Sequence, residues 1–179
     1  MARRPVRGVA LPRGAPGLAR FHEAQAASWA GFDAALRELR DGRKTGHWIW
    51  WVFPQLRGLG QSHNSTYYGI ASLEEAADYL RDSVLGERLV EAAAVVRSHL
   101  AGPRPLDLET LMGGMIDAQK LVSCMTLFRY VAHRLGGEGP PPHFGIMAGH
   151  AETILAAAAA QGHPPCRFTE ESIRRSRAS

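Results

Sequence analysis

Hydrophobic positions recur at intervals of three and four residues along most of the chain, which is the period of an amphipathic α-helix. The clearest case runs from Phe21 to Leu39 and stops just before Gly42, a residue type that commonly ends helices. The same period, with capping residues or stop signals, predicts further helices over Ser72–Leu80, Val84–Leu100, Asp107–Met112, Asp117–Leu135 and Ala148–Ala160. We therefore expect an all-α fold, a compact single-domain bundle of about six helices.

One stretch breaks this period, because the apolar run from Trp48 to Phe53 is continuous. Such a run suits either a buried strand or a short buried helix, and periodicity does not separate the two. The rest of the chain offers no partner strands, so we predict a short helix that ends before Pro54. The glycines and small polar residues from Gly58 to Ser65 then predict a loop.

The two ends of the chain carry no comparable pattern. Residues 1–18 mix Arg, Pro, Gly and Ala without an apolar period, so we expect a disordered basic extension. Residues 19–161 form the expected helical domain, and residues 162–179 a flexible tail.

The basic net charge of the chain comes from its two ends and not from the predicted domain. The formal net charge is +4 and the pI about 9.5, but residues 1–20 hold five arginines and residues 163–179 four, which leaves the body slightly acidic. This distribution does not fit a folded nucleic-acid reader and leaves only weak binding of nucleic acid through the tails. No segment has the length of a membrane span, and Cys124 and Cys166 follow no metal or redox spacing. We expect a soluble cytoplasmic protein without a membrane partner, and its oligomeric state stays open.

The first candidate for ligand binding is the stretch from His47 to Ser62. It holds three of the four tryptophans of the chain beside polar groups and a Gly-Leu-Gly turn. Aromatic rings could stack a planar ligand, the turn could expose backbone N–H groups, and an arginine could hold phosphate or carboxylate. Equally, the tryptophans could be ordinary core and the arginine a surface residue. The candidate ligand-binding residues here are His47, Trp48, Trp51, Gln55, Arg57, Gly58, Gly60 and Ser62.

A second candidate is the helical stripe formed by Asp117, Lys120, Ser123 and Thr126, which are spaced three residues apart. The chain has 21 basic residues but only two lysines, Lys44 and Lys120, and a lysine can lose its proton and attack carbon where arginine practically cannot. The alternative is a solvated helix face with an ordinary Asp–Lys pair.

Glu23 is a third candidate, as an acid or base, although a stabilising place in the first turn of a helix is the simpler explanation. We assign catalytic roles to Lys120, Asp117 and Glu23, and ligand-binding roles to Lys44, Ser123 and Thr126. The eight histidines show no HExxH or paired Cys/His spacing, and the Gly-Leu-Gly turn is no dinucleotide fingerprint, so no metal or cofactor is predicted.

Five motifs resemble the bacterial domain-of-unknown-function family 1810. They are FHEAQ at Phe21–Gln25, GRKTGHWIWWVFPQLRGLGQS at Gly42–Ser62, YGI at Tyr68–Ile70, LGERL at Leu85–Leu89 and DAQKLVSCMTLF at Asp117–Phe128. The resemblance covers about residues 18 to 160 and departs in the arginine-rich N-terminal extension and in HAETIL at His150–Leu155. It implies a compact all-helical fold and no settled activity.

In architecture the chain is also distantly similar to the YbiA-like NADAR group, small helical proteins associated with removing ADP-ribose from a nucleobase. That similarity implies that the tryptophans and His47 stack a base, and that Arg57 and the glycine turn hold phosphates. Lys120 or Lys44, with Glu23 or Asp117, would then act on the ribosyl C1. Our first hypothesis is accordingly a hydrolase of a glycosidic bond in an ADP-ribosyl or related nucleotide substrate. The alternative is a non-catalytic module that binds a small metabolite or a partner through residues 47–62.

Overall fold

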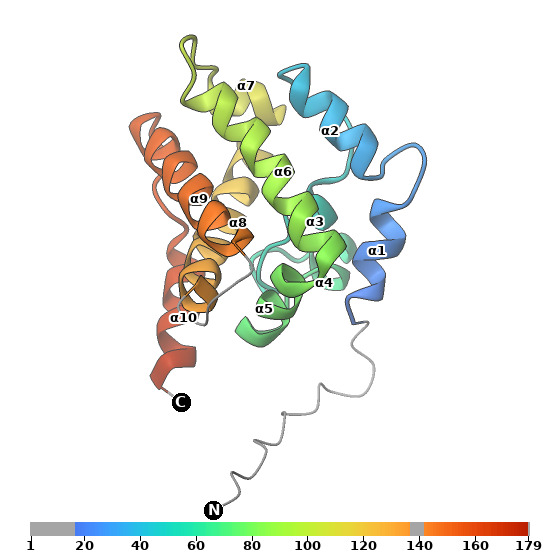
Figure 1. Cartoon of the computed structure of the whole chain (residues 1–179), viewed down its shortest axis with the longest axis vertical. Coiled ribbons are helices and arrows are strands. Elements are labelled where there is room, and N and C mark those ends of the chain that lie inside the picture. Colours follow the sequence, from blue (N-terminus) through green and yellow to red (C-terminus); the bar gives the residue numbers. More distant parts are fainter. Residues whose placement is uncertain (1–16, 137–141, 179) are drawn as a thin grey trace, which may run out of the picture.

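The structure, a computed structural model, describes residues 17–136 and 142–178. These residues contain ten α-helices and no β-strand (Figure 1). One isolated parallel bridge joins Leu56 and Ile70. The helices are α1 Ala19–Gln25, α2 Phe32–Arg40, α3 Ile49–Val52, α4 His63–Tyr67, α5 Leu73–Arg81, α6 Ser83–Leu100, α7 Leu108–Met112, α8 Met115–Gly136, α9 His143–Ala160 and α10 Arg167–Ala178. The all-helical, compact fold expected from the sequence is confirmed, but the prediction of about six helices is too low.

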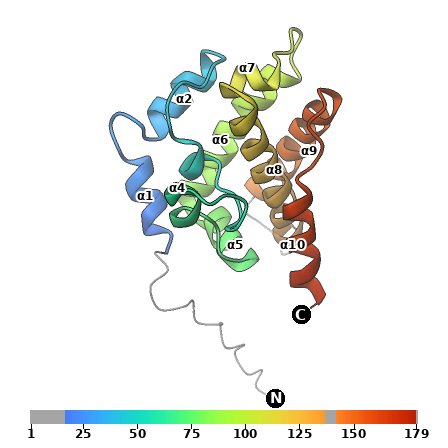
Figure 2. The same ribbon diagram turned by 180° about the vertical axis from the view of Figure 1, so that it is seen from behind.

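Helix α8 is the centre of the molecule. It packs against α3, α5, α7, α9 and α10, and in Figure 2 it lies between α4 and α10. Every residue from Leu121 to Phe128 is buried, so this part of α8 is surrounded on all sides rather than presenting one apolar face. Helix α6 packs against α9, α5 and α2 on the side that faces the viewer in Figure 1.

The helix predicted from Phe21 to Leu39 is wrong, because the chain forms two helices there. Helix α1 ends at Gln25, and α2 begins after Gly31. A side chain at Gly31 would place its Cβ 2.0 Å from the carbonyl oxygen of Ala27, so the turn depends on this glycine. Ala24 and Ala27 continue the apolar period across the break without adding enough buried surface to hold a single helix.

Two further segments differ from expectation. Residues expected in a loop after Gly58 include α4, where the hydroxyl of Ser62 caps the helix by accepting a hydrogen bond from the N–H of Ser65. Residues expected in a flexible tail from 162 include α10, which is anchored on α8 by the buried side chains of Thr169 and Ile173.

The remaining helix predictions are confirmed in kind, with small shifts of boundary. Ser72 caps α5 and Asp107 caps α7 through the predicted side chains, and α6 spans the predicted residues almost without change. Helix α9 begins five residues before the predicted Ala148. Residues 1–16 of the expected basic extension and residues 137–141 of the expected loop lie outside the described residues. Within the described ranges, none of the helices combines the length and hydrophobicity needed to cross a bilayer.

Candidate functional site

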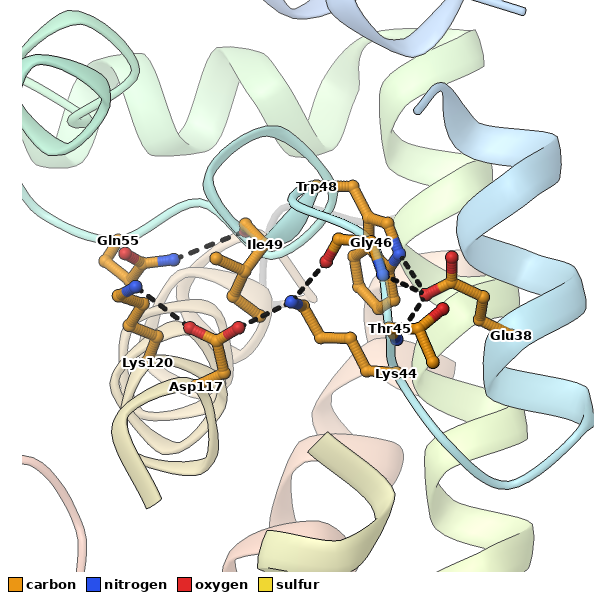
Figure 3. A network of polar contacts seen from close by, with 9 residues as sticks. All are labelled: Glu38, Lys44, Thr45, Gly46, Trp48, Ile49, Gln55, Asp117 and Lys120. Carbon is orange, nitrogen blue, oxygen red and sulfur yellow. Dashed lines mark hydrogen bonds and ion pairs between the residues drawn. The ribbon is translucent and has the colours of Figure 1, made fainter. Parts of the chain in front are cut away.

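The two lysines of the chain share one aspartate. The Lys44 ammonium lies 2.5 Å from Oδ2 of Asp117, and the Lys120 ammonium donates a hydrogen bond of 2.9 Å to Oδ1 of the same carboxylate (Figure 3). The Asp117–Lys120 spacing of three residues on α8 was visible in the sequence, but the third member comes from the loop before α3. An ordinary Asp–Lys pair on a helix face is therefore extended into a triad that joins two distant segments.

Backbone contacts hold Lys44 against α7 and the turn between α7 and α8. The N–H of Lys44 donates to the carbonyl of Leu111 on α7, and Gly113, at the end of α7, lies close to the carbonyl of Lys44. Gly113 has φ +75°, and a Cβ there would lie 2.6 Å from the carbonyl oxygen of Lys44. Only glycine therefore allows both the left-handed turn and this close approach.

Glu38 fixes the other end of the same loop. Its Oε2 accepts hydrogen bonds from the backbone N–H groups of Thr45 and Gly46 and from the indole N–H of Trp48. Partial burial favours the neutral acid, but these hydrogen bonds outweigh it and lower the pKa of Glu38 below its ordinary value. The carbonyl of Gly46 in turn accepts from Lys44, so one polar network runs from α2 to α8 (Figure 3).

Each ammonium group also lies over an indole ring. Lys44 Nζ is 5.1 Å from the centroid of Trp48, and Lys120 Nζ is 4.4 Å from that of Trp50. The two lysines differ in exposure, since the side chain of Lys44 is 5% exposed and that of Lys120 is 20% exposed. Lys44 uses two of its three N–H donors, on Asp117 and Gly46, whereas the hydrogen bonds found for Lys120 use one. Lys120 therefore has more unused donors than Lys44 and is the more exposed of the two.

The environment of Asp117 favours its charged form. Burial would raise the pKa of this carboxyl, but the hydrogen bonds and charges of Lys44 and Lys120 outweigh burial, so the pKa lies below its ordinary value. A carboxylate held in this way is a poor proton donor near neutral pH. Its effect is to keep two ammonium groups at fixed positions.

A cavity of about 460 Å³ opens beside Lys120. Three segments form its walls: the loop from α3 to α4 with the start of α4, the first half of α8, and the linker from α9 to α10. Its volume falls within the range of small-molecule sites. The lining residues are Gln55, Leu59, Gly60, Ser65, Ile116, Gln119, Lys120, Val122, Gly162, His163, Pro164 and Cys166.

Polar contacts on two sides hold the linker wall in place. Cys166 donates its backbone N–H to Oγ1 of Thr126, and the hydroxyls of Ser123 and Thr169 lie 3.0 Å apart. On the other side, His163 Nε2 lies 3.3 Å from a carboxylate oxygen of Glu109 on α7. The linker is thus attached to both α7 and α8, which gives the cavity a defined third wall.

The cavity brings together some of the residues singled out from the sequence. Gln55 and Gly60 line it from the first stretch, and Lys120 lines it from the second. Asp117 and Lys44 support Lys120 without being lining residues. Both predicted stretches therefore contribute to one cavity, although through fewer side chains than the sequence suggested.

Other candidates do not line this cavity. Trp48 is fully buried, and Trp51 donates its indole N–H to the carbonyl of Ala30, so both act in packing. Ser62 caps α4, while Ser123 and Thr126 make the buried hydrogen bonds that hold α10 and the linker. The exposed residues Glu23 and His47 and the glycine Gly58, which adopts φ +97° beside Phe168, are not lining residues either.

Arg57 borders a second, smaller hollow of about 150 Å³, between the loop before α5 and α10. This hollow and the cavity share no lining residue. The predicted phosphate clamp therefore does not belong to the same site as Lys120.

Sequence reasoning missed the linker wall, because residues after Gly162 were expected to be a flexible tail. The signal was present in Thr169 and Ile173, whose spacing of four residues matches one face of a helix. An α10 docked on α8 requires the preceding residues, His163 to Cys166, to pass over the first half of α8. The described residues contain no group of three or more His, Cys, Asp or Glu side chains arranged to hold a metal ion.

Comparison with known proteins gives a family and a related structure. The family model described as "protein of unknown function (DUF1810)" matches residues 15–136, and the chain belongs to this family. The crystal structure of the conserved hypothetical protein Rv1873 from Mycobacterium tuberculosis is similar, with 37% sequence identity and a TM-score of 0.62 over 85% of this chain and 92% of that one. No curated protein matches the chain. The resemblance to the family is thus confirmed, while the similarity to the NADAR group stays a prediction.

Proposed function

We propose that this member of the DUF1810 family binds a small molecule carrying an anionic group in the cavity beside Lys120. The observation that carries the proposal is the position of Lys120, whose ammonium is held by Asp117 over the Trp50 ring while it lines a cavity of about 460 Å³. A cation fixed before the ligand arrives loses little conformational entropy on binding.

The surroundings of Lys120 suit binding better than chemistry. Its partner Asp117 has both carboxylate oxygens occupied by ammonium groups, and Glu23 belongs to neither the cavity nor the network. Most of the exposed surface that lines the cavity is apolar, as in many small-molecule sites. This favours the non-catalytic binding module over the hydrolase, with Gln55 and Gly60 as the contribution of the stretch from residue 47 to 62.

Hydrolysis of an ADP-ribosyl glycosidic bond is the second candidate, and the observation that favours it is the Asp117–Lys120 pair at the cavity wall. Glycoside hydrolysis commonly needs a carboxyl group at the reacting carbon, and no Asp or Glu is among the lining residues. We therefore expect no release of ADP-ribose from NAD or from ADP-ribosylated nucleosides above the uncatalysed rate. Turnover that is lost in Asp117→Asn and Lys120→Met would reverse this preference.

A thermal-shift experiment tests the binding proposal. The probes are octanoate, benzoate, AMP and ADP-ribose, added to the wild type, to Lys120→Met and to the control Arg37→Met, which removes one exposed positive charge on α2. A ligand that binds only the folded state raises the melting temperature. We expect at least one anion to raise it in the wild type and in the control but not in Lys120→Met. Equal shifts in all three proteins, or no shift with any probe, would contradict the proposal.

A further inference from the structure

We infer that the ligand of the cavity is a singly charged carboxylate with an apolar body, rather than a nucleotide or another phosphate compound. The inference rests on the proposed function and narrows it to one chemical class. It comes from the charges around Lys120, the nature of the other lining residues and the position of Arg57.

The triad supplies one net positive charge. Lys44 and Lys120 contribute two and Asp117 removes one, and the lining residues include neither an arginine nor an acidic side chain. His163 offers the ligand no free positive charge, because its Nε2 faces the carboxylate of Glu109 at 3.3 Å. Asp117 also lies in the first turn of α8, where it offsets the partial positive charge of the helix N-terminus. The single negative charge of one carboxylate group would neutralise the net positive charge of the triad.

A phosphate group would leave negative charge uncompensated. A phosphate monoester carries about −1.5 to −2 at pH 7, and a diphosphate carries more. Arg57, the residue expected to clamp phosphate bidentately, borders the separate hollow beside α10. The cavity therefore lacks the second cation that a phosphate or diphosphate would require.

The remaining walls fit the carbon skeleton of such an acid. Leu59, Ile116, Val122 and Pro164 line the cavity with carbon. Two of these residues are exposed, Leu59 by 36% and Ile116 by 69%. A ligand with an apolar body would cover part of this surface, and burial of apolar area is favourable by about 25 cal/mol per Å².

Cys166 provides a direct reporter of occupancy. It lines the cavity and is partly exposed, whereas Cys124, the other cysteine of the chain, is completely buried, which raises the pKa of its thiol well above the ordinary value. Iodoacetamide should therefore modify Cys166 first. A ligand in the cavity should slow this reaction, and the variant Cys166→Ser shows how much of the signal comes from this thiol.

The experiment measures the rate of Cys166 modification by intact-protein mass spectrometry in the presence of matched probes. These are octanoate, octanamide and octyl phosphate, together with 2-naphthoate and its amide. We expect at least one carboxylate to protect Cys166 at a concentration about tenfold or more below that of its amide, the difference made by a hydrogen bond to a charged group. The advantage should disappear in Lys120→Met and persist in Arg37→Met.

Three results would overturn the inference, and they have different meanings. Equal protection by a carboxylate and its amide would show a cavity that binds apolar compounds without selecting the charge. Stronger protection by octyl phosphate than by octanoate would show that the site accepts the larger charge. Absence of protection by all five probes, combined with a thermal shift from AMP or ADP-ribose that depends on Lys120, would refute the carboxylate and leave the proposed function standing.

Discussion

The two ends of the Lys44–Asp117–Lys120 triad differ in what surrounds them. Lys44 is almost fully buried, donates to Asp117 and Gly46, and belongs to the network that Glu38 completes (Figure 3). Lys120 binds the same aspartate but lines a cavity and remains one-fifth exposed. The same residue type, on the same carboxylate, is thus buried in a polar network at one end and beside a cavity at the other. What separates them is the number of donors already used and the access of solvent.

Asp117→Asn should have the largest effect, because it breaks both ends at once. The substitution leaves the buried Lys44 ammonium without its carboxylate, and loss of one partner of a buried ion pair costs about 3–5 kcal/mol. We expect a loss near the upper part of that range in the free energy of unfolding, measured by urea denaturation. A loss below about 1 kcal/mol would mean that the triad contributes little to the fold.

Lys44→Met should have the next largest effect, about 3 kcal/mol, because Asp117 keeps Lys120 as a partner while the carbonyl of Gly46 loses its donor. The aliphatic part of the side chain can still pack on Trp48. The control is Arg40→Met, which removes an exposed pair with Glu91 and should cost at most about 1 kcal/mol. Similar losses in the two variants would contradict the structural role of Lys44.

Acid should weaken the triad at both ends. Because the fold lowers the pKa of Asp117 below its ordinary value of 3.8, the stabilisation is fully present above that value and is lost as the pH falls through the lower, folded pKa. Glu38 and Asp82 act in the same direction, so the informative quantity is a difference between proteins. Between about pH 5 and pH 2 the free energy of unfolding should fall less steeply in Asp117→Asn than in the wild type. Parallel curves would show that Asp117 is not stabilised as a carboxylate.

The sequence was informative where one local rule governed the outcome. Capping residues Ser72 and Asp107 and the regular apolar period of α6 led to confirmed helices. It was misleading where the backbone geometry of a turn decided, as at Gly31, where the turn between α1 and α2 depends on a close approach to the Ala27 carbonyl that no periodicity reveals. Short polar segments such as α4 gave too little signal for a helix prediction.

For the candidate site, the sequence identified the two lysines and Asp117 but not that both lysines contact the same carboxylate. Spacing on α8 indicated the contact of Asp117 with Lys120, whereas Lys44 reaches the same carboxylate only because Gly113 lets its loop lie against the α7–α8 turn. The tryptophans were visible as a cluster, yet their direction depends on α3, which turns Trp48 into the core and leaves Trp50 beneath Lys120. The third wall of the cavity is the linker before α10. Its position depends on contacts between residues far apart in the sequence, such as Cys166 with Thr126, which the sequence does not reveal.

The division of roles between the two lysines is tested most directly by measuring stability and octanoate affinity together in Lys44→Met and Lys120→Met. Lys120→Met should lose at most about 1 kcal/mol of stability, because its ion pair is partly exposed, while its affinity for octanoate falls about tenfold or more. Lys44→Met should lose about 3 kcal/mol of stability and retain affinity within a few-fold of the wild type at temperatures where it is folded. The opposite ranking, or equal losses of both quantities in the two variants, would contradict the account.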